Sequence, residues 1–119
     1  MHNFKELRVW HVASDLAVEI EPLTRALPRP NATELAGQLR RSALSIPSNI
    51  AEGCGRATRP DSVRFFGMAL SSATETESHL LIAGKSGYLT AKRLRPLLDR
   101  VIVIEKMIQS LIDRLPPGE

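Results

Sequence analysis

The 119-residue chain is poor in cysteine, in aromatic residues and in long apolar runs. Cys54 is its single cysteine, which excludes an internal disulfide framework and fits a reducing compartment. Aromatic residues make up 4% of the chain and hydrophobic residues 43%, so a core must be built from leucine, isoleucine, valine and alanine. This composition favours helices over a β-sandwich, which would need more valine, threonine and aromatic residues.

No apolar run approaches the roughly 20 residues that a membrane-spanning helix needs. The first apolar residues are interrupted by Lys5, Glu6, Arg8 and Asp15, so we expect no targeting segment. The length is that of one domain, residues 1–119. We therefore expect a cytoplasmic protein that does not associate with membranes.

Apolar residues recur at spacings of three and four along most of the chain, which predicts α-helices. The stripes predict four helices at about residues 5–27, 33–52, 61–86 and 90–115. Between them lie connectors rich in proline and glycine, and Thr33 and Thr90 are positioned to cap the helices that follow. Short connectors favour an all-α, up-down-up-down antiparallel four-helix bundle. The same three loop signals exclude one long two-stranded coiled coil.

Pro47 lies inside the apolar stripe of the second predicted helix. An interior proline removes a backbone donor and costs roughly 3 kcal/mol. Either the helix ends there, or it bends and continues; we expect the bend, because the apolar pattern resumes at Ile50 and Gly53 offers a natural stop. Short polar side chains surround the proline and can bond the backbone groups that it frees: Ser42, Ser45, Ser48 and Asn49.

The other helices carry features of their own. Pro22 is expected to bend or fray the end of the first helix. Gly67 and several alanines and serines make the third helix thin, so that a neighbour can approach closely. The fourth helix has three unbroken heptads from Leu94 to Leu115, and Ile102 widens its apolar stripe. That surplus fits either a self-association face or a well-filled core.

The net charge of +3 is unevenly distributed. Residues 25–64 contain seven arginines against three acidic residues, which gives +4. Arginine pairs bidentately with phosphate, so basic ends of a bundle favour nucleic-acid binding, whereas solvated helix ends are the alternative. One end of the bundle would gather Arg25, Arg29, Lys85, Lys92, Arg93 and Arg95, and the other Arg56, Arg59 and Arg64 with Lys5 and Arg8.

The residue pattern predicts no catalytic site, no metal site and no cofactor. His2, His11 and His79 are scattered, and no Glu-x-x-His pair of the di-iron type occurs near Glu75 and Glu77. These two glutamates fall at or beside the stripe of the third helix. We expect them in a structural hydrogen-bond network with the polar residues around Pro47, or paired with arginines 40 and 41.

The segment from Gln38 to Gly53 resembles the signature of the four-helix-bundle proteins encoded by intervening sequences of 23S ribosomal RNA genes. Further matching segments are Phe4–Trp10, Arg64–Ala69, Glu75 with Glu77, and Gly87–Leu89. This family in turn is similar to the accessory variability determinant of diversity-generating retroelements. The signature residues of the resemblance are Ser45, Pro47, Ser48, Asn49, Glu52, Gly53 and Glu75.

The resemblance implies a four-helix bundle that assembles as a ring-like homopentamer. For the retroelement members it implies a basic surface for nucleic acid and a partner reverse transcriptase. Our first hypothesis is therefore a non-enzymatic, oligomeric protein that binds RNA or DNA. The alternatives are a protein-interaction adaptor, for a reverse transcriptase among others, and a structural protein.

Overall fold

The computed structural model describes residues 3–116. This range contains a short 3-10 helix, η1 (Phe4–Glu6), and four α-helices: α1 (Arg8–Ala26), α2 (Thr33–Cys54), α3 (Arg59–Lys85) and α4 (Ala91–Asp113). No strand occurs in it, so the predicted all-α class with four helices is confirmed for the described residues. None of the helices in this part of the chain is long and apolar enough to cross a membrane.

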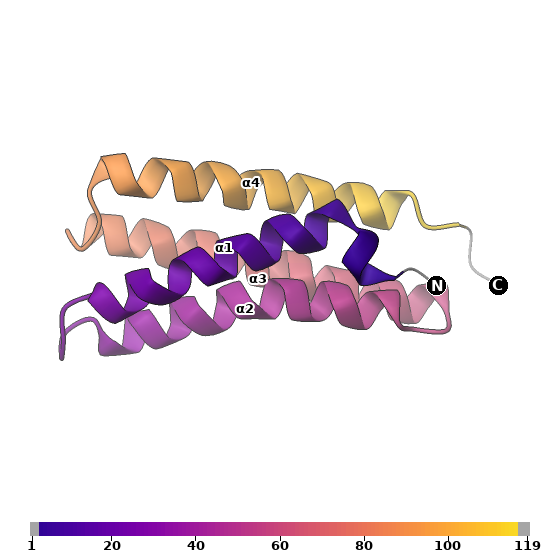
Figure 1. The fold of residues 1–119 in the computed structure, drawn as a ribbon, viewed down its shortest axis with the longest axis horizontal. Helices are drawn as coiled ribbons and strands as arrows, with labels where there is room; N and C mark the ends of the chain where they lie inside the picture. The colour runs from indigo at the N-terminus through magenta and orange to yellow at the C-terminus, as the bar shows by residue number, and fades with distance from the viewer. Residues whose placement is uncertain (1–2, 117–119) are drawn as a thin grey trace.

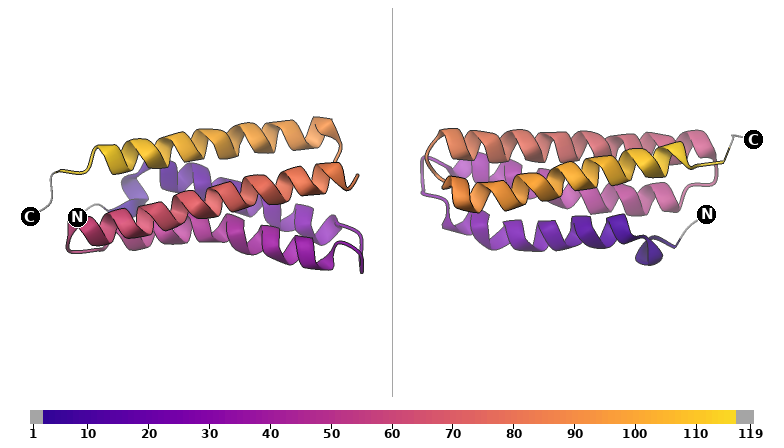
Figure 2. Two further views of the ribbon diagram at one scale, coloured as in Figure 1. Left: turned by 180° about the vertical axis from the view of Figure 1, so that it is seen from behind. Right: turned by 90° about the horizontal axis from the view of Figure 1, so that it is seen from above.

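The helices lie along one long axis of a molecule that measures 49 × 23 × 20 Å. Connectors 27–32 and 86–90 lie at the same end, which we call the paired-connector end (Figure 1). Connector 55–58 lies at the opposite end, which we call the single-connector end, as the two further views in Figure 2 also show. Each helix contacts the next one in sequence, and α1 also contacts α4.

The core consists of the residues that the helical spacing predicts. In α3 the predicted stripe is buried throughout, and it consists of Phe66, Ala69, Ala73, Thr76, Leu80 and Ala83. In α4, Leu97, Val101 and Ile104 form the buried seam. Burial of apolar surface contributes about 25 cal/mol per Å², so these seams supply the main driving force for folding.

Pro22, Pro47 and Pro96 lie inside helices that continue past them. α1 ends four residues after Pro22, and α2 reaches Cys54 beyond a buried Pro47. The expectation that the second helix continues is confirmed. Ser48 Oγ donates to the Leu44 carbonyl at 3.0 Å, and Asn49 Nδ2 donates to the Ser45 carbonyl at 2.9 Å. Side-chain donors thus bond carbonyls in the turn where Pro47 has no N–H to offer.

Several predicted helix ends were wrong or shifted. Residues before Arg8 form η1 and an extended Leu7 instead of the start of α1. Thr33 is the first residue of α2 rather than its cap, because Ala32 occupies the cap position and offers no side-chain bond. Thr90 caps α4 as predicted, accepting from the Arg93 N–H at 3.3 Å.

Gly53 does not end α2; the helix extends to Cys54 and Gly55 is the cap residue. The true glycine stop is at the end of α3, where Gly87 has φ 81°. There the Tyr88 N–H bonds the Ala83 carbonyl at 2.9 Å and the Gly87 N–H bonds the Gly84 carbonyl at 3.1 Å. This is a Schellman motif, which requires a left-handed residue and so favours glycine.

A polar network joins α2 to α3 in the middle of the bundle. Ser45 Oγ lies 2.9 Å from Ser72 Oγ and accepts from Asn49 Nδ2 at 2.9 Å. One turn away, Thr76 Oγ1 donates to the Ser72 carbonyl at 2.8 Å and lies 2.9 Å from Ser42 Oγ. The predicted network between these helices is present, but it is built from hydroxyl and amide groups.

The glutamates that we expected in this network lie elsewhere. Glu75 is exposed, and Glu77 meets Glu105 of α4 instead of α2. The reason is geometric: neighbouring residues on a helix point about 100° apart, so Glu75 and Glu77 flank the buried Thr76 on opposite sides. The expected pairing of these residues with α2 was therefore wrong.

Candidate nucleic-acid interface

The structure places the predicted basic residues in two groups about one bundle length apart. Six of them surround connectors 27–32 and 86–90 at the paired-connector end, all exposed: Arg25, Arg29, Lys85, Lys92, Arg93 and Arg95. The other three belong to the single-connector end: Arg56, Arg59 and Arg64. The two groups differ in how far their charge is already neutralised.

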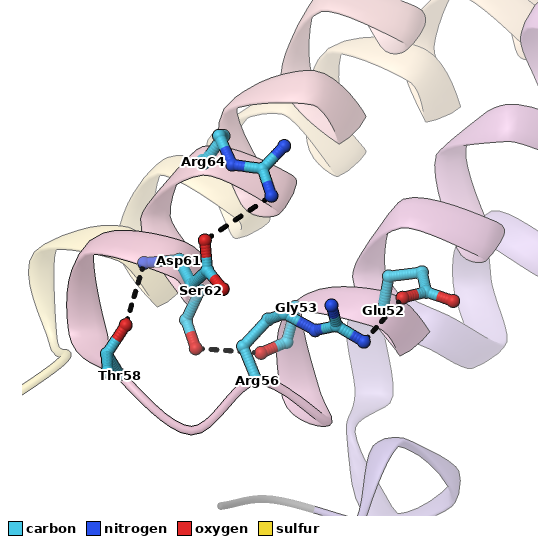
Figure 3. A network of polar contacts seen from close by, with 7 residues as sticks. All are labelled: Glu52, Gly53, Arg56, Thr58, Asp61, Ser62 and Arg64. Atoms are coloured by element: carbon cyan, nitrogen blue, oxygen red, sulfur yellow. Dashed lines mark hydrogen bonds and ion pairs between the residues drawn. The ribbon is translucent and has the colours of Figure 1, made fainter.

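The single-connector end is an ordered turn held by local polar contacts (Figure 3). Thr58 caps α3 by accepting from the Asp61 N–H at 3.3 Å. Pro60 occupies the first turn of the helix, where a missing N–H costs nothing. Ser62 Oγ donates to the Gly53 carbonyl at 2.8 Å and so ties the start of α3 to the end of α2.

Two of the arginines at this end are paired with acidic neighbours. Arg56 contacts Glu52 at 3.0 Å and Arg64 contacts Asp61 at 3.3 Å, as Figure 3 shows. Both guanidinium groups also lie over the ring of Phe65, at 5.0 Å and 4.4 Å from its centroid. These contacts hold the arginines in place and reduce the charge that they offer to a phosphate.

Most basic residues at the paired-connector end have no acidic partner to neutralise them. Arg25 pairs with Glu21 at 2.9 Å, but the other five basic residues there make no ion pair within residues 3–116. Lys92, Arg93 and Arg95 lie in the first turns of α4, whose first turn contains no acidic residue. Cations are favourable at helix C-termini and unfavourable at N-termini, so fold stability does not account for this placement.

The signature residues do not form one site. Ser45 and Asn49 belong to the network between α2 and α3, and Glu52 pairs with Arg56. Pro47 and Ser48 line a groove between α1 and α2. Gly53 and Glu75 lie apart from both, the first against Phe66 and the second exposed on α3.

Other titratable residues add no cluster. Cys54 is buried, and burial raises the pKa of its thiol, which disfavours the reactive thiolate. Residues 3–116 contain no group of three or more histidine, cysteine, aspartate or glutamate side chains that could hold a metal ion. His11 Nε2 donates to the Lys5 carbonyl at 2.7 Å, and His79 Nδ1 lies 3.3 Å from Ser42 Oγ, whereas His2 lies outside the described residues.

The sequence interpretation missed Phe65 and the acidic partners of the arginines. The spacing of Glu52 to Arg56 (i, i+4) and of Asp61 to Arg64 (i, i+3) is typical of helix ion pairs and could have revealed them. The contact of Phe65 with the Arg56 guanidinium group depends on the path of connector 55–58. No local signal in the sequence predicts it.

Fold and charge together define a small all-α protein of four helices with basic ends. Residues 5–110 match the family described as 23S rRNA-intervening sequence protein. The chain therefore belongs to this family, and that part of the predicted resemblance is confirmed. A search of curated proteins gave no match.

One similar solved structure is a crystal structure of a protein with unknown function from the S23 ribosomal protein family of Bacteroides thetaiotaomicron VPI-5482. It shares 27% sequence identity with this chain at a TM-score of 0.79. The match covers 87% of this chain and 97% of the other.

Proposed function

We propose that this protein is a non-enzymatic, cytoplasmic nucleic-acid-binding protein. In this proposal it works as an up-down-up-down antiparallel bundle that assembles into a ring-like homopentamer. The paired-connector end is the surface that contacts phosphate. The observation that carries the proposal is the group of exposed basic residues there that have no acidic partner in the described chain.

The start of α4 supports this assignment. Lys92, Arg93 and Arg95 lie beside backbone N–H groups that the helix leaves unpaired, and both features attract anions. Unpaired cations at a helix N-terminus cost stability in the free protein, and a bound phosphate would remove that cost. An oligomer would repeat the patch, so that weak contacts add through effective concentration.

The relatives favour RNA over DNA as the ligand. The family is described by its relation to 23S rRNA, and the similar crystal structure by its relation to an S23 ribosomal protein family. Neither description names a ligand for this chain. Structured RNA is therefore the first ligand to test, with duplex DNA of equal length beside it.

The test is filter binding across a salt series with two charge-matched triple variants. Lys92→Ala/Arg93→Ala/Arg95→Ala removes three cations from the paired-connector end. Lys5→Ala/Arg8→Ala/Arg114→Ala removes three exposed cations from the opposite end. Each lost phosphate contact reduces the slope of log K against log salt by about 0.7–0.9. We expect the first variant to lose up to three such contacts and the second to lose none.

Two outcomes would contradict the proposal. Absence of binding by the wild type at ~50 mM salt would exclude a phosphate-driven interaction, because such affinity is greatest at low salt. Equal losses in both triple variants would mean that net charge alone governs binding. Variants of Arg56 and Arg64 should change the slope less, since ion pairs already hold these residues.

A protein-interaction adaptor is the second candidate function. Ile102 and Val103 are exposed on α4, and Leu81 is exposed on α3. Such a surface favours a partner protein, for which a reverse transcriptase is the candidate that the retroelement resemblance suggests. A neighbouring reverse-transcriptase gene, with loss of co-purification in Ile102→Asp, would favour the adaptor; an insertion within a ribosomal RNA gene would favour the first function.

A further inference from the structure

An apolar groove of about 640 Å³ runs between α1 and α2 on the surface of the bundle. Its apolar walls come from both helices: Trp10, Ala17, Val18, Leu44, Pro47 and Ala51. Val18 is 71% exposed and Leu44 is 59% exposed, the highest values among the large hydrophobic residues of the described chain. A groove with two such residues beside it leaves apolar area in water that a bound helix could cover.

The charge at the mouth of the groove is positive. Arg40 and Arg41 line it from α2, are exposed, and make no ion pair within residues 3–116. Glu21 lines it from α1, but Arg25 already neutralises that carboxylate. The groove is therefore complementary to an apolar surface that carries a negative charge.

A surface of this kind occurs on α3 of the same chain. Met68, Glu75 and Ile82 follow one another at intervals of seven residues, so they share one stripe of the helix. Met68 is 44% exposed and Ile82 is 45% exposed. Glu75 lies between them, exposed and without an ion pair in the described residues. Serines 71 and 78 occupy the gaps of the stripe, and their small side chains allow a close approach.

We propose that the α3 stripe of one copy docks in the α1–α2 groove of a second copy. The inference rests on the oligomeric part of the proposed function and names its interface. Glu75 would meet Arg40 and Arg41, and Met68 or Ile82 would enter the apolar part of the groove. On α4, by contrast, the exposed Ile102 and Val103 are adjacent, and no acidic residue lies between them as Glu75 lies between Met68 and Ile82.

The spacing of the two surfaces agrees with this arrangement. Seven residues separate Arg41 from Ser48 in the groove, and seven separate Glu75 from Met68 or Ile82. At 1.5 Å per residue both distances are about 10.5 Å along the helix. When Glu75 pairs with Arg41, an apolar side chain therefore lies beside Ser48, between Leu44 and Ala51.

The groove and the stripe are different surfaces of the chain, so the contact is heterologous. Each copy uses its groove for one neighbour and its stripe for another. Such contacts close into a ring where the rotation between copies allows it, and otherwise extend into a filament. The proposal is thus compatible with a closed ring of identical contacts and needs no symmetric interface.

Charge reversal tests the proposal, with the oligomeric state measured by sedimentation velocity and folding checked by circular dichroism. Arg41→Glu and Glu75→Arg should each raise the dissociation constant of the oligomer at least tenfold. The double variant, which restores the opposite charges, should associate again. Lys106→Glu is the matched control on α4 and should leave association unchanged. Leu44→Asp should dissociate the oligomer, whereas Val103→Asp should not.

The outcomes separate this interface from the wider proposal. An oligomeric wild type whose association is insensitive to Arg41→Glu, Glu75→Arg and Leu44→Asp would overturn the interface and leave the oligomer standing. Dissociation by Val103→Asp alone would assign the contact to α4 and overturn the proposal. A monomeric wild type at micromolar concentration would overturn both the interface and the oligomer, while the salt-dependence assay would still decide nucleic-acid binding.

Discussion

Phe66 of α3 packs directly against Gly53 of α2, where no side chain could fit. A Cβ atom added to Gly53 would lie 2.5 Å from Phe66 Cε1 and 2.6 Å from Cδ1. Phe66 is fully buried, so its ring cannot move into solvent. The glycine thus permits the close approach of α2 and α3 at the single-connector end, next to the Ser62–Gly53 hydrogen bond.

We expect Gly53→Ala to destabilise the protein by about 2 kcal/mol. Overpacking a core costs about 1–3 kcal/mol, and the better helix propensity of alanine returns up to about 1 kcal/mol of that. Urea denaturation followed by circular dichroism measures the change. The sign of this change in stability is the critical result. At a helix glycine without a tight neighbour, replacement by alanine would stabilise the protein instead.

Gly67→Ala provides the matched control. Gly67 also lies inside a helix, but nothing stands within 4 Å of an added Cβ there. Gly67 itself therefore takes no part in the close approach expected of the small residues of this helix, of which Ala69, Ser72 and Ala73 are buried. Alanine at this position should stabilise the protein by about 0.5–1 kcal/mol. Similar effects at positions 53 and 67 would show that the contact with Phe66 carries no energy.

The hydroxyl pair of Ser45 and Ser72 should contribute to the packing of α2 on α3. Ser72→Ala removes one partner of a 2.9 Å contact at a buried position, and we expect a loss of about 1 kcal/mol. Ser110→Ala, on α4 and without a side-chain hydrogen bond in the described chain, should change stability by less than about 0.5 kcal/mol.

A double-mutant cycle with Ser45→Ala separates the pair from its surroundings. We expect a coupling energy of about 0.5–1 kcal/mol between the two serines. Additive effects of the two substitutions, with no coupling, would mean that the contact between their hydroxyl groups contributes nothing. Unfolding in urea at one fixed pH is sufficient for all three variants.

The features predicted correctly from the sequence were those that repeat. Heptad spacing of leucine and isoleucine predicted the buried seams, because each repeat adds to the same signal. Single residues with several possible roles were harder. Gly53 was interpreted as a helix stop, since that is a common local role of glycine, whereas its contact with Phe66 depends on a residue thirteen positions away.

In the candidate interface, too, the general arrangement could be predicted from the sequence, but the contacts of single residues could not. The two basic ends could be predicted from connector lengths alone, because helices joined by short loops return to the same ends. Which arginines keep their charge could be predicted only in part. The spacing of Glu52 and Asp61 indicates their ion pairs, but the contact of Phe65 with Arg56 depends on how connector 55–58 folds back.

Glu105 should make stability depend on pH. Burial, together with a hydrogen bond and charge repulsion from Glu77, raises the pKa of Glu105 from 4.5 to about 7, and a bond from Thr74 opposes the shift. One of its carboxyl oxygens is buried without a hydrogen-bond partner among the described residues. The folded protein therefore keeps a proton on Glu105 at pH values where the unfolded chain has released it.

The sign follows from proton linkage. Between pH 4.5 and about 7 the folded state binds more protons than the unfolded state, so the free energy of unfolding falls as pH rises. The loss is complete above the folded pKa. One pKa unit corresponds to about 1.4 kcal/mol, and solvent screens a half-buried group, so we expect a loss of about 1–2 kcal/mol between pH 5 and pH 8.

Glu105→Gln should remove this dependence, because the amide stays neutral at every pH. Urea unfolding at pH 5 and pH 8 measures the effect as the difference between variant and wild type, in which contributions common to both proteins cancel. The free energy of unfolding of the variant minus that of the wild type should be about 1–2 kcal/mol larger at pH 8 than at pH 5. Asp99→Asn, at an exposed position on the same helix, should follow the wild type at both pH values. Equal slopes for Glu105→Gln and the wild type would mean that the Glu77–Glu105 contact does not hold a proton in the folded protein.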